Sequence, residues 1–238
     1  ADKARLSKRH GATSVMAYQE MGFLPEALVN YLVRLGWSHG DQEIFSMTEL
    51  IDLFDLDAVG KSAAIFNPDK LLWLNAHYIK QYHPDKLMAA VKPFWAARGC
   101  DVANEDFLGR VVGDLRRRAK TLVEMTEAGQ FYFAEALTYD PEAKAKFLTA
   151  DVAGHLHDLA RDLALLADYT KEGIEDFLRR FTEARNVKLK IIAQPLRIAL
   201  TGKTVSPGID EVMVTLGKER VIKRLEDALA IIAAEAGA

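Results

Sequence analysis

Pairs of a polar residue and a proline recur along this chain and constrain it strongly towards helix. Asn67-Pro68, His83-Pro84 and Asp140-Pro141 each place a proline where the first turn of a helix tolerates it, since proline lacks the N–H that a helix interior needs. Ser46 and Glu49 have the spacing of a capping box. Runs of alternating apolar and polar residues joined by hairpin turns are missing. The sequence therefore predicts an all-α fold.

Apolar residues at helical spacing fill the segments between these signals. A helix is expected after Pro25, with Gly36 placed to end it. The longest expected helix runs from about 105 to 127 and carries the apolar stripe Val111, Leu115, Ala119 and Leu122. Further helices are expected at residues 151–169, 170–184, 187–200 and from 218 to the end.

Composition excludes several classes of protein. The chain has 238 residues, half of them hydrophobic and about a quarter charged, as in ordinary globular domains. No apolar run approaches the roughly 20 residues that cross a bilayer, and the first residues lack the apolar segment of a signal peptide. A single cysteine, Cys100, allows no internal disulfide and suits a reducing compartment. We expect a cytoplasmic monomer without a membrane segment.

Charge is distributed unevenly although the net charge is only −3. Seven acidic residues lie between Asp41 and Asp69 with Lys61 as the only cation, whereas five cations and one acid lie between Arg110 and Lys120. A third biased stretch contains Arg179, Arg185, Lys188, Lys190, Arg197 and Lys203. Separate basic patches suit a ligand that is held at several points, as a nucleic acid is. The competing interpretation is that these charges are solvated helix faces.

Three short matches point to chemistry that the surrounding sequence does not support. Tyr82-His83-Pro84-Asp85-Lys86 resembles the turn of J-domain co-chaperones, but the preceding segment lacks the strongly basic helix of a J-domain. Gly202-Lys203-Thr204 resembles the end of a P-loop, but Arg197 stands where the first glycine is required. His155 and His157 are two residues apart, so a helix points them to different faces, and we expect no metal site.

The basic stretch from 110 to 120 offers a candidate base-reading arginine. On a continuous helix, Arg118 lies at the edge of the apolar stripe, so that its stem packs while its guanidinium reaches outward. Such an arginine can donate two hydrogen bonds to one base edge. The alternative is a structural arginine that pairs with Asp114 four residues earlier.

A cationic loop opens the chain, with Arg5, Ser7, Lys8, Arg9 and Gly11 in one short run. Hydroxyls, backbone N–H groups and cations are the donors that hold a nucleotide triphosphate. This loop is followed by an ordered series of motifs: LSKRHG at 6–11, GFLPEALVNYL at 22–32, LGWS at 35–38, FNPDKLLWLN at 66–75 with Tyr78-Ile79, QPLRIALTG at 194–202, SPG at 206–208 and LGKE at 216–219. The series resembles bacterial glutamyl-tRNA synthetases, members of class I, over essentially the whole chain.

This resemblance implies a domain organisation. Residues 1–12 would be the signature loop that closes a Rossmann catalytic domain, and the rest of that domain would be absent. Residues 13–82 would form the stem-contact helical domain. Residues 83–130 and 131–238 would form the two subdomains of a helical anticodon-binding region. The chain thus resembles the tRNA-binding half of an enzyme that attaches glutamate to glutamate tRNA, using ATP and Mg²⁺, through a glutamyl-adenylate.

The resemblance also implies residue roles. Lys8, with Ser7 and Arg5, would bind the ATP triphosphate and stabilise the charge that develops during adenylation. This role would require the catalytic domain, which binds glutamate and ATP. Arg118 would read the third anticodon base and so reject glutamine tRNA. Arg116 and Arg117 belong to the same cluster. The alignment with the family leaves a shift of one position open for the arginine that reads the base. Arg197 and Ser206 match the region that contacts the first anticodon base.

Two functions remain open from the sequence. The first is the tRNA-recognition half of a discriminating glutamate–tRNA ligase, which we expect to hold no ATP and to be inactive alone. The second is a stand-alone helical module that binds tRNA or protein without catalysis.

Overall fold

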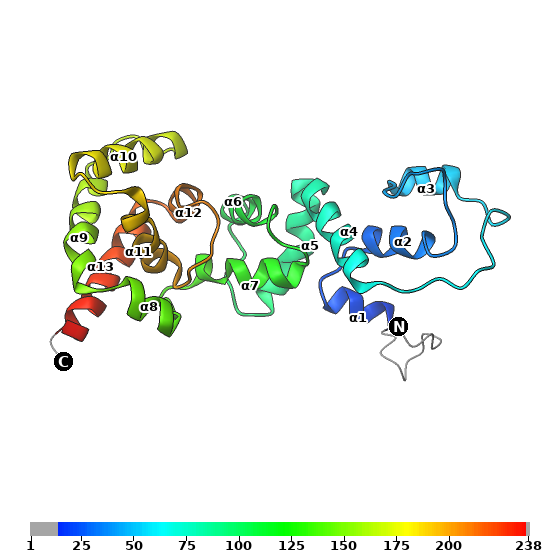
Figure 1. Ribbon diagram of the computed structural model, residues 1–238, viewed down its shortest axis with the longest axis horizontal. Helices are drawn as coiled ribbons and strands as arrows, with labels where there is room; N and C mark the ends of the chain where they lie inside the picture. The colour runs from blue at the N-terminus through cyan, green and yellow to red at the C-terminus, as the bar shows by residue number, and fades with distance from the viewer. Residues whose placement is uncertain (1–13, 237–238) are drawn as a thin grey trace. The chain divides into compact units, whose positions relative to one another are not determined.

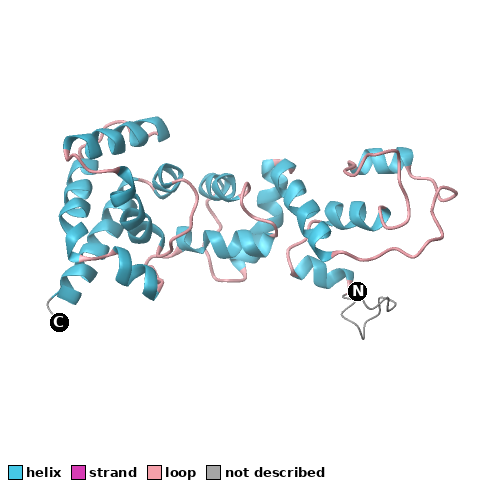
Figure 2. Ribbon diagram, viewed as in Figure 1, coloured by secondary structure: helices cyan, strands magenta, loops and turns pink. Residues whose placement is uncertain are grey.

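The computed structural model describes residues 14–236, and within them thirteen helices account for all regular structure (Figures 1 and 2). Those residues contain no strand, only an isolated bridge between His39 and Gln42. The all-α prediction is confirmed. The chain divides into two compact units: residues up to Val102 with Leu115–Ala128, and Ala103–Asp114 with the remainder from Gly129.

The first unit contains five helices and the first turns of another. These are α1 (Val15–Glu20), α2 (Pro25–Val33), α3 (Met47–Leu53), α4 (Pro68–Gln81), α5 (Pro84–Ala96) and the beginning of α7 (Leu122–Phe133). The expected start signals are confirmed: Asn67 caps α4 by accepting hydrogen bonds from the N–H groups of Asp69 and Lys70, and Ser46 and Glu49 form a complete capping box. Helices α2, α4 and α5 all begin with proline.

Helices α2 and α4 pack against each other through Leu28, Tyr31, Leu71 and Leu74. A buried amide ties the loop after α2 to this pair. Asn30 donates to Glu43 O at 3.0 Å and accepts from Phe45 N and the Tyr78 hydroxyl, each at 2.8 Å. Because a buried amide is costly without partners, these three bonds fix the path of the loop.

The second unit contains α6 (Glu105–Leu115, except its last residue), the end of α7, α8 (Pro141–Phe147), α9 (Ala150–Ala164), α10 (Lys171–Ala184), α11 (Leu189–Thr201), α12 (Ile209–Leu216) and α13 (Lys218–Ala236). Helix α9 runs along α13, and α11 packs against both (Figure 1). Most of these helices lie where the periodicity predicts them. Helix α12, with 8 residues, and α1 in the first unit, with 6, were not predicted, because helices this short have little room to show a period.

The single helix expected from 105 to 127 is wrong in its middle. Helix α6 ends at Leu115, α7 begins at Leu122, and residues 116–121 form a turn between them. The apolar stripe continues across the gap because Ala119 and Leu122 remain buried after the helix has ended. Thr121 and Glu124 have capping-box spacing, and this signal marks the new helix start in the sequence.

Candidate nucleic-acid interface

The turn at residues 116–121 carries the arginine cluster, and its backbone is fixed at both ends. The N–H groups of Arg118 and Ala119 both donate to Leu115 O, at 3.0 and 3.2 Å, which closes the turn directly after α6. The Ala119 side chain is buried. Of the three arginines before it, Arg116 is half-buried, whereas Arg117 and Arg118 are exposed.

Arg116 binds the end of a neighbouring helix. Its Nη2 donates to the carbonyl oxygens of Lys80 at 2.7 Å and Tyr82 at 2.6 Å, with Ile79 O further away at 3.4 Å. These carbonyls lie at the C-terminus of α4, where a helix leaves acceptors unpaired and its dipole favours a cation. Arg116 thus acts as a structural clamp within the first unit.

The far side of the turn is held by Asn75, which is fully buried. Its amide donates to Lys120 O at 2.6 Å, and its Oδ1 accepts from Leu24 N at 2.8 Å. The Thr121 hydroxyl accepts from Glu124 N at 3.0 Å, and the Glu124 carboxylate accepts from Lys120 N at 2.9 Å. Sequence analysis named Asn75 only within a motif and missed its role. Its place among apolar residues in LLWLN was the available signal.

Arg117 and Arg118 are both exposed, and neither has an ion-pair partner among residues 14–236. The helix-edge position expected for Arg118 is wrong, because the helix ends before it. The alternative pairing with Asp114 is also wrong, since the Asp114 carboxylate accepts from the hydroxyls of Tyr132 at 2.6 Å and Thr215 at 2.7 Å. Burial raises the pKa of Asp114, against the effect of these two hydrogen bonds. A rigid turn therefore presents two free guanidinium groups to solvent.

Arg197 and Ser206, predicted together, lie in contact in the second unit. Arg197 Nη1 donates to the Ser206 hydroxyl and to Pro207 O, the latter at 2.8 Å. The Ser206 hydroxyl in turn donates to Pro207 O at 2.8 Å and is part of a residue that is only 8 % exposed. The pair therefore joins α11 to the loop before α12, and Ser206 has little surface to offer a ligand.

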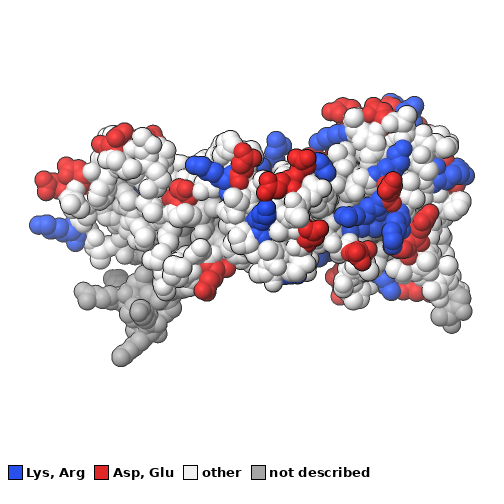
Figure 3. Space-filling model, turned by 180° about the vertical axis from the view of Figure 1, so that it is seen from behind, with Lys and Arg blue, Asp and Glu red and all other residues white. Residues whose placement is uncertain are grey.

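Lys and Arg side chains gather on one face of the second unit, as Figure 3 shows for the part of the molecule that contains α8 to α13. Two arginines of this unit are neutralised by ion pairs: Arg179 pairs with Asp176 and Glu183, and Arg185 pairs with Asp158 and Asp162. The solvated-face interpretation fits Arg179, whose side chain is 60% exposed, but not Arg185, which stacks on the Phe181 ring and is 21% exposed. Arg5, Ser7 and Lys8, the predicted triphosphate donors, lie outside the described residues.

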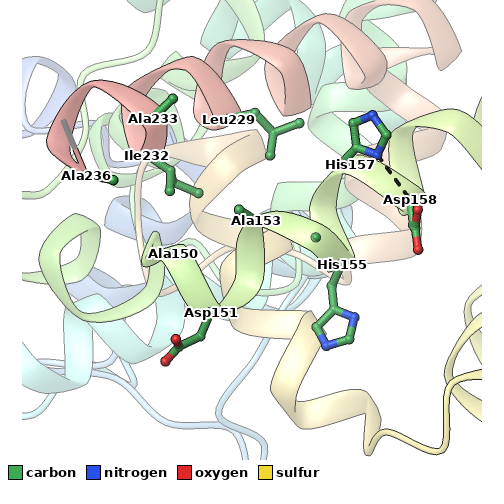
Figure 4. Close-up of a pocket in the computed structure, with 11 residues that line it drawn as sticks. Ala150, Asp151, Ala153, His155, His157, Asp158, Leu229, Ile232, Ala233 and Ala236 are labelled. Carbon is green, nitrogen blue, oxygen red and sulfur yellow. Dashed lines mark ion pairs between the residues drawn. The ribbon is translucent and has the colours of Figure 1, made fainter.

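A hollow of about 710 Å³ lies between α9 and α13, with an apolar floor that includes Leu229 and Ile232 (Figure 4). His155 and His157 lie on its rim and point to different sides of α9, as expected, and His157 Nδ1 is 3.8 Å from the Asp158 carboxylate. Among residues 14–236 no group of three or more potential metal ligands comes together. Within the same residues, none of the helices has the length and apolar character to span a bilayer.

The sequence matches two models of known protein families. Residues 86–229 match the family model described as "Anticodon binding domain", which includes the 116–121 turn, Arg197 and Ser206. Residues 1–73 match "tRNA synthetases class I (E and Q), catalytic domain". The first match covers more than half of the chain, so the chain belongs to the anticodon-binding domain family.

The similar proteins and structures found by comparison are named as glutamate–tRNA ligases. A protein of Syntrophus aciditrophicus named "Glutamate--tRNA ligase 1" is 65% identical over 98% of this chain and 49% of its own length. A glutamate–tRNA ligase of Syntrophobacter fumaroxidans is 50% identical over 99% of the chain and 50% of its own length. The crystal structure of a glutamate tRNA ligase from Elizabethkingia meningosepticum has a TM-score of 0.86 at 28% identity, covering 98% of this chain and 49% of that one. The chain spans about half the length of the curated relatives it matches.

Proposed function

We propose that this chain is the tRNA-recognition part of a glutamate–tRNA ligase. The observation that carries the proposal is the match, along almost the whole chain, to relatives that bear this name. The catalytic-domain match over residues 1–73 favours it over a stand-alone helical module. In this function the chain binds glutamate tRNA as a monomer in the cytoplasm, and the complete enzyme joins glutamate to that tRNA with ATP and Mg²⁺. The domain limits at residues 12, 82 and 130 remain part of the proposal.

Arg118 is the residue we assign to the third anticodon base. Its guanidinium is exposed on a turn whose backbone is held by Arg116 and Asn75, so only the side chain, and not the backbone of the turn, has to be ordered when it meets a base. The planar fork donates two parallel hydrogen bonds, which suits a base edge better than the point charge of lysine. Arg116 is engaged with carbonyls of α4, which favours Arg118 over Arg116 as the reader.

Arg197 and Ser206 act on the first anticodon base through the loop they hold. Arg197 reaches three acceptors in residues 206–207, so this loop keeps one shape before tRNA arrives. We assign the contact with the first anticodon base to this pre-shaped loop. Arg5, Ser7 and Lys8 bind the ATP triphosphate in the complete enzyme, where developing negative charge calls for positioned cations.

Binding to two versions of one tRNA tests the proposal. The affinity of this chain is measured for glutamate tRNA and for the same tRNA with its third anticodon base changed from C to G, at fixed salt. We expect about tenfold tighter binding to the C form, equivalent to about 1.4 kcal/mol. Arg118→Gln should remove this preference. Arg118→Lys, which keeps the charge and loses the fork, should bind both forms with similar affinity.

Equal binding of both forms by the unchanged chain would contradict the discrimination and leave only contacts to the RNA backbone. A preference that survives Arg118→Gln would move the reading role to another residue. If the chain bound neither form more tightly than unrelated RNA, tRNA recognition itself would be refuted.

A further inference from the structure

A second cationic feature lies beside the arginine turn, where α4 meets α5. A hollow of about 580 Å³ is lined by Lys80, Gln81, Tyr82, His83, Pro84, Arg116 and Arg117. All of these residues belong to the first unit. The lining includes the Tyr82-His83-Pro84 segment, which resembled a J-domain turn and to which the proposed function gives no role.

The side chains that line the hollow suit an anion. Lys80 and Arg117 are exposed cations, and neither has an ion-pair partner among the described residues. No acidic residue lines the hollow. Two carboxylates contact residues of the lining: Glu26 Oε1 accepts from the Tyr82 hydroxyl at 2.8 Å, and the largely exposed Asp85 lies 3.6 Å from His83 Nδ1. Lys80 and Arg117 therefore line one concave surface, and neither of them is paired with these carboxylates.

The polar backbone groups around the hollow also favour an anion. The carbonyl groups of Lys80 and Tyr82 would repel an anion, but both accept hydrogen bonds from Arg116. Helix α5 begins at Pro84, the His83 side chain does not cap it, and Asp85 lies in its first turn. The first N–H groups of this 13-residue helix thus lack a capping side chain and add to the positive potential.

We propose that this hollow binds a phosphodiester group of the tRNA backbone, with Arg117 and Lys80 as its charged donors and His83 on its rim. The inference rests on the proposed function and extends it. Arg117 donates through its fork to two phosphate oxygens, and Lys80 contributes a mobile point charge. Contacts of this kind position RNA and carry no base information, whereas Arg118, the next residue, reads the base. Adjacent arginines thereby divide affinity and specificity between them.

The double substitution Lys80→Gln with Arg117→Gln tests this division. It removes two charges from exposed side chains and leaves the clamp of Arg116 and Asn75 intact. Binding to the C and G forms of glutamate tRNA is measured over a range of salt concentrations. We expect affinity to fall about threefold to tenfold for both forms and the slope of log K against log salt to become shallower by about 1. The preference for the C form should be unchanged.

Two controls make the outcome specific. Lys80→Arg with Arg117→Lys retains both charges and should keep the wild-type salt slope. Lys61→Gln removes an exposed lysine from the acidic stretch of the same unit and should leave binding unchanged. Ethylation of single tRNA phosphates should weaken wild-type binding at one position to which the double variant is insensitive.

A double variant that keeps the wild-type affinity, salt slope and ethylation pattern would overturn the phosphate site and leave the proposed function intact. Loss of the C preference together with affinity would also overturn it, since the hollow would then act in base reading. Failure of the unchanged chain to bind glutamate tRNA would refute both proposals.

Discussion

At the scale of a single residue, Arg224 shows how a buried cation organises helix ends in the second unit. It is 2 % exposed, and it donates to Leu200 O at 2.5 Å, Phe131 O at 2.7 Å and Ala134 O at 2.9 Å. These carbonyls lie at the C-termini of α11 and α7, where helices leave acceptors unpaired. Burial lowers the pKa of Arg224 to about 10, so the group stays protonated at neutral pH.

Arg224→Met should lower the free energy of unfolding by about 2–4 kcal/mol, because it removes the donor from two buried carbonyls and one part-buried carbonyl. Urea-induced unfolding followed by circular dichroism measures the change. Lys223→Met is the matched control: Lys223 is exposed and, within residues 14–236, its ion pair is with Asp227, so its loss should cost less than about 1 kcal/mol. Equal effects of the two substitutions would show that Arg224 does not hold the helix ends.

At the scale of an element, the turn after α1 is fitted to the first residues of α7. Gly22 has φ of +82°, and its carbonyl accepts a hydrogen bond from Leu122 N at 2.9 Å. A side chain at this position would place Cβ 2.6 Å from Val123 N and 2.7 Å from Leu122 N. Contacts this short force the backbone apart. The start of α7, and with it the arginine turn that precedes it, depends on the absence of a side chain here.

Gly22→Ala should therefore destabilise the chain by more than about 2 kcal/mol, the sum of left-handed strain and steric conflict. Gly99→Ala separates the two causes, since Gly99 has φ of +75° but no atom within 4 Å of its Cβ position. Its cost should stay near 1 kcal/mol. Thermal unfolding of both variants, with binding to glutamate tRNA, provides the measurement. If Gly99→Ala were as costly as Gly22→Ala, strain alone would explain the loss.

At the scale of the whole molecule, the chain consists of two helical units, and α7 contributes its first residues to one and its last residues to the other. It spans about half the length of its curated relatives. The proposed function assigns tRNA recognition to these two units. The arginine turn and the Arg197–Ser206 loop each take their shape from contacts within their own unit.

We expect the purified 238-residue chain to bind glutamate tRNA and to form no glutamyl-adenylate. Arg5, Ser7 and Lys8 supply donors for the triphosphate alone, and no residue of the chain is assigned to glutamate or adenine. Glutamate-dependent exchange of pyrophosphate into ATP measures this activity. Exchange above the level of a chain carrying Lys8→Ala would contradict the expectation.

The sequence by itself determined the helical class, because helix starts are local: proline at the first turn and the Ser46–Glu49 capping box need only their own neighbours. The resemblance also named Arg197 and Ser206 for one role, and the structure added that the two side chains are in contact. The break between α6 and α7 was decided by tertiary structure, since a buried stripe continues across it and hides it from periodicity. The same holds for the three arginines. Arg116 binds carbonyl groups of α4, Arg117 lines the hollow and Arg118 is exposed to solvent. These three identical side chains differ in role because α4, Asn75 and Gly22 fix the backbone that carries them.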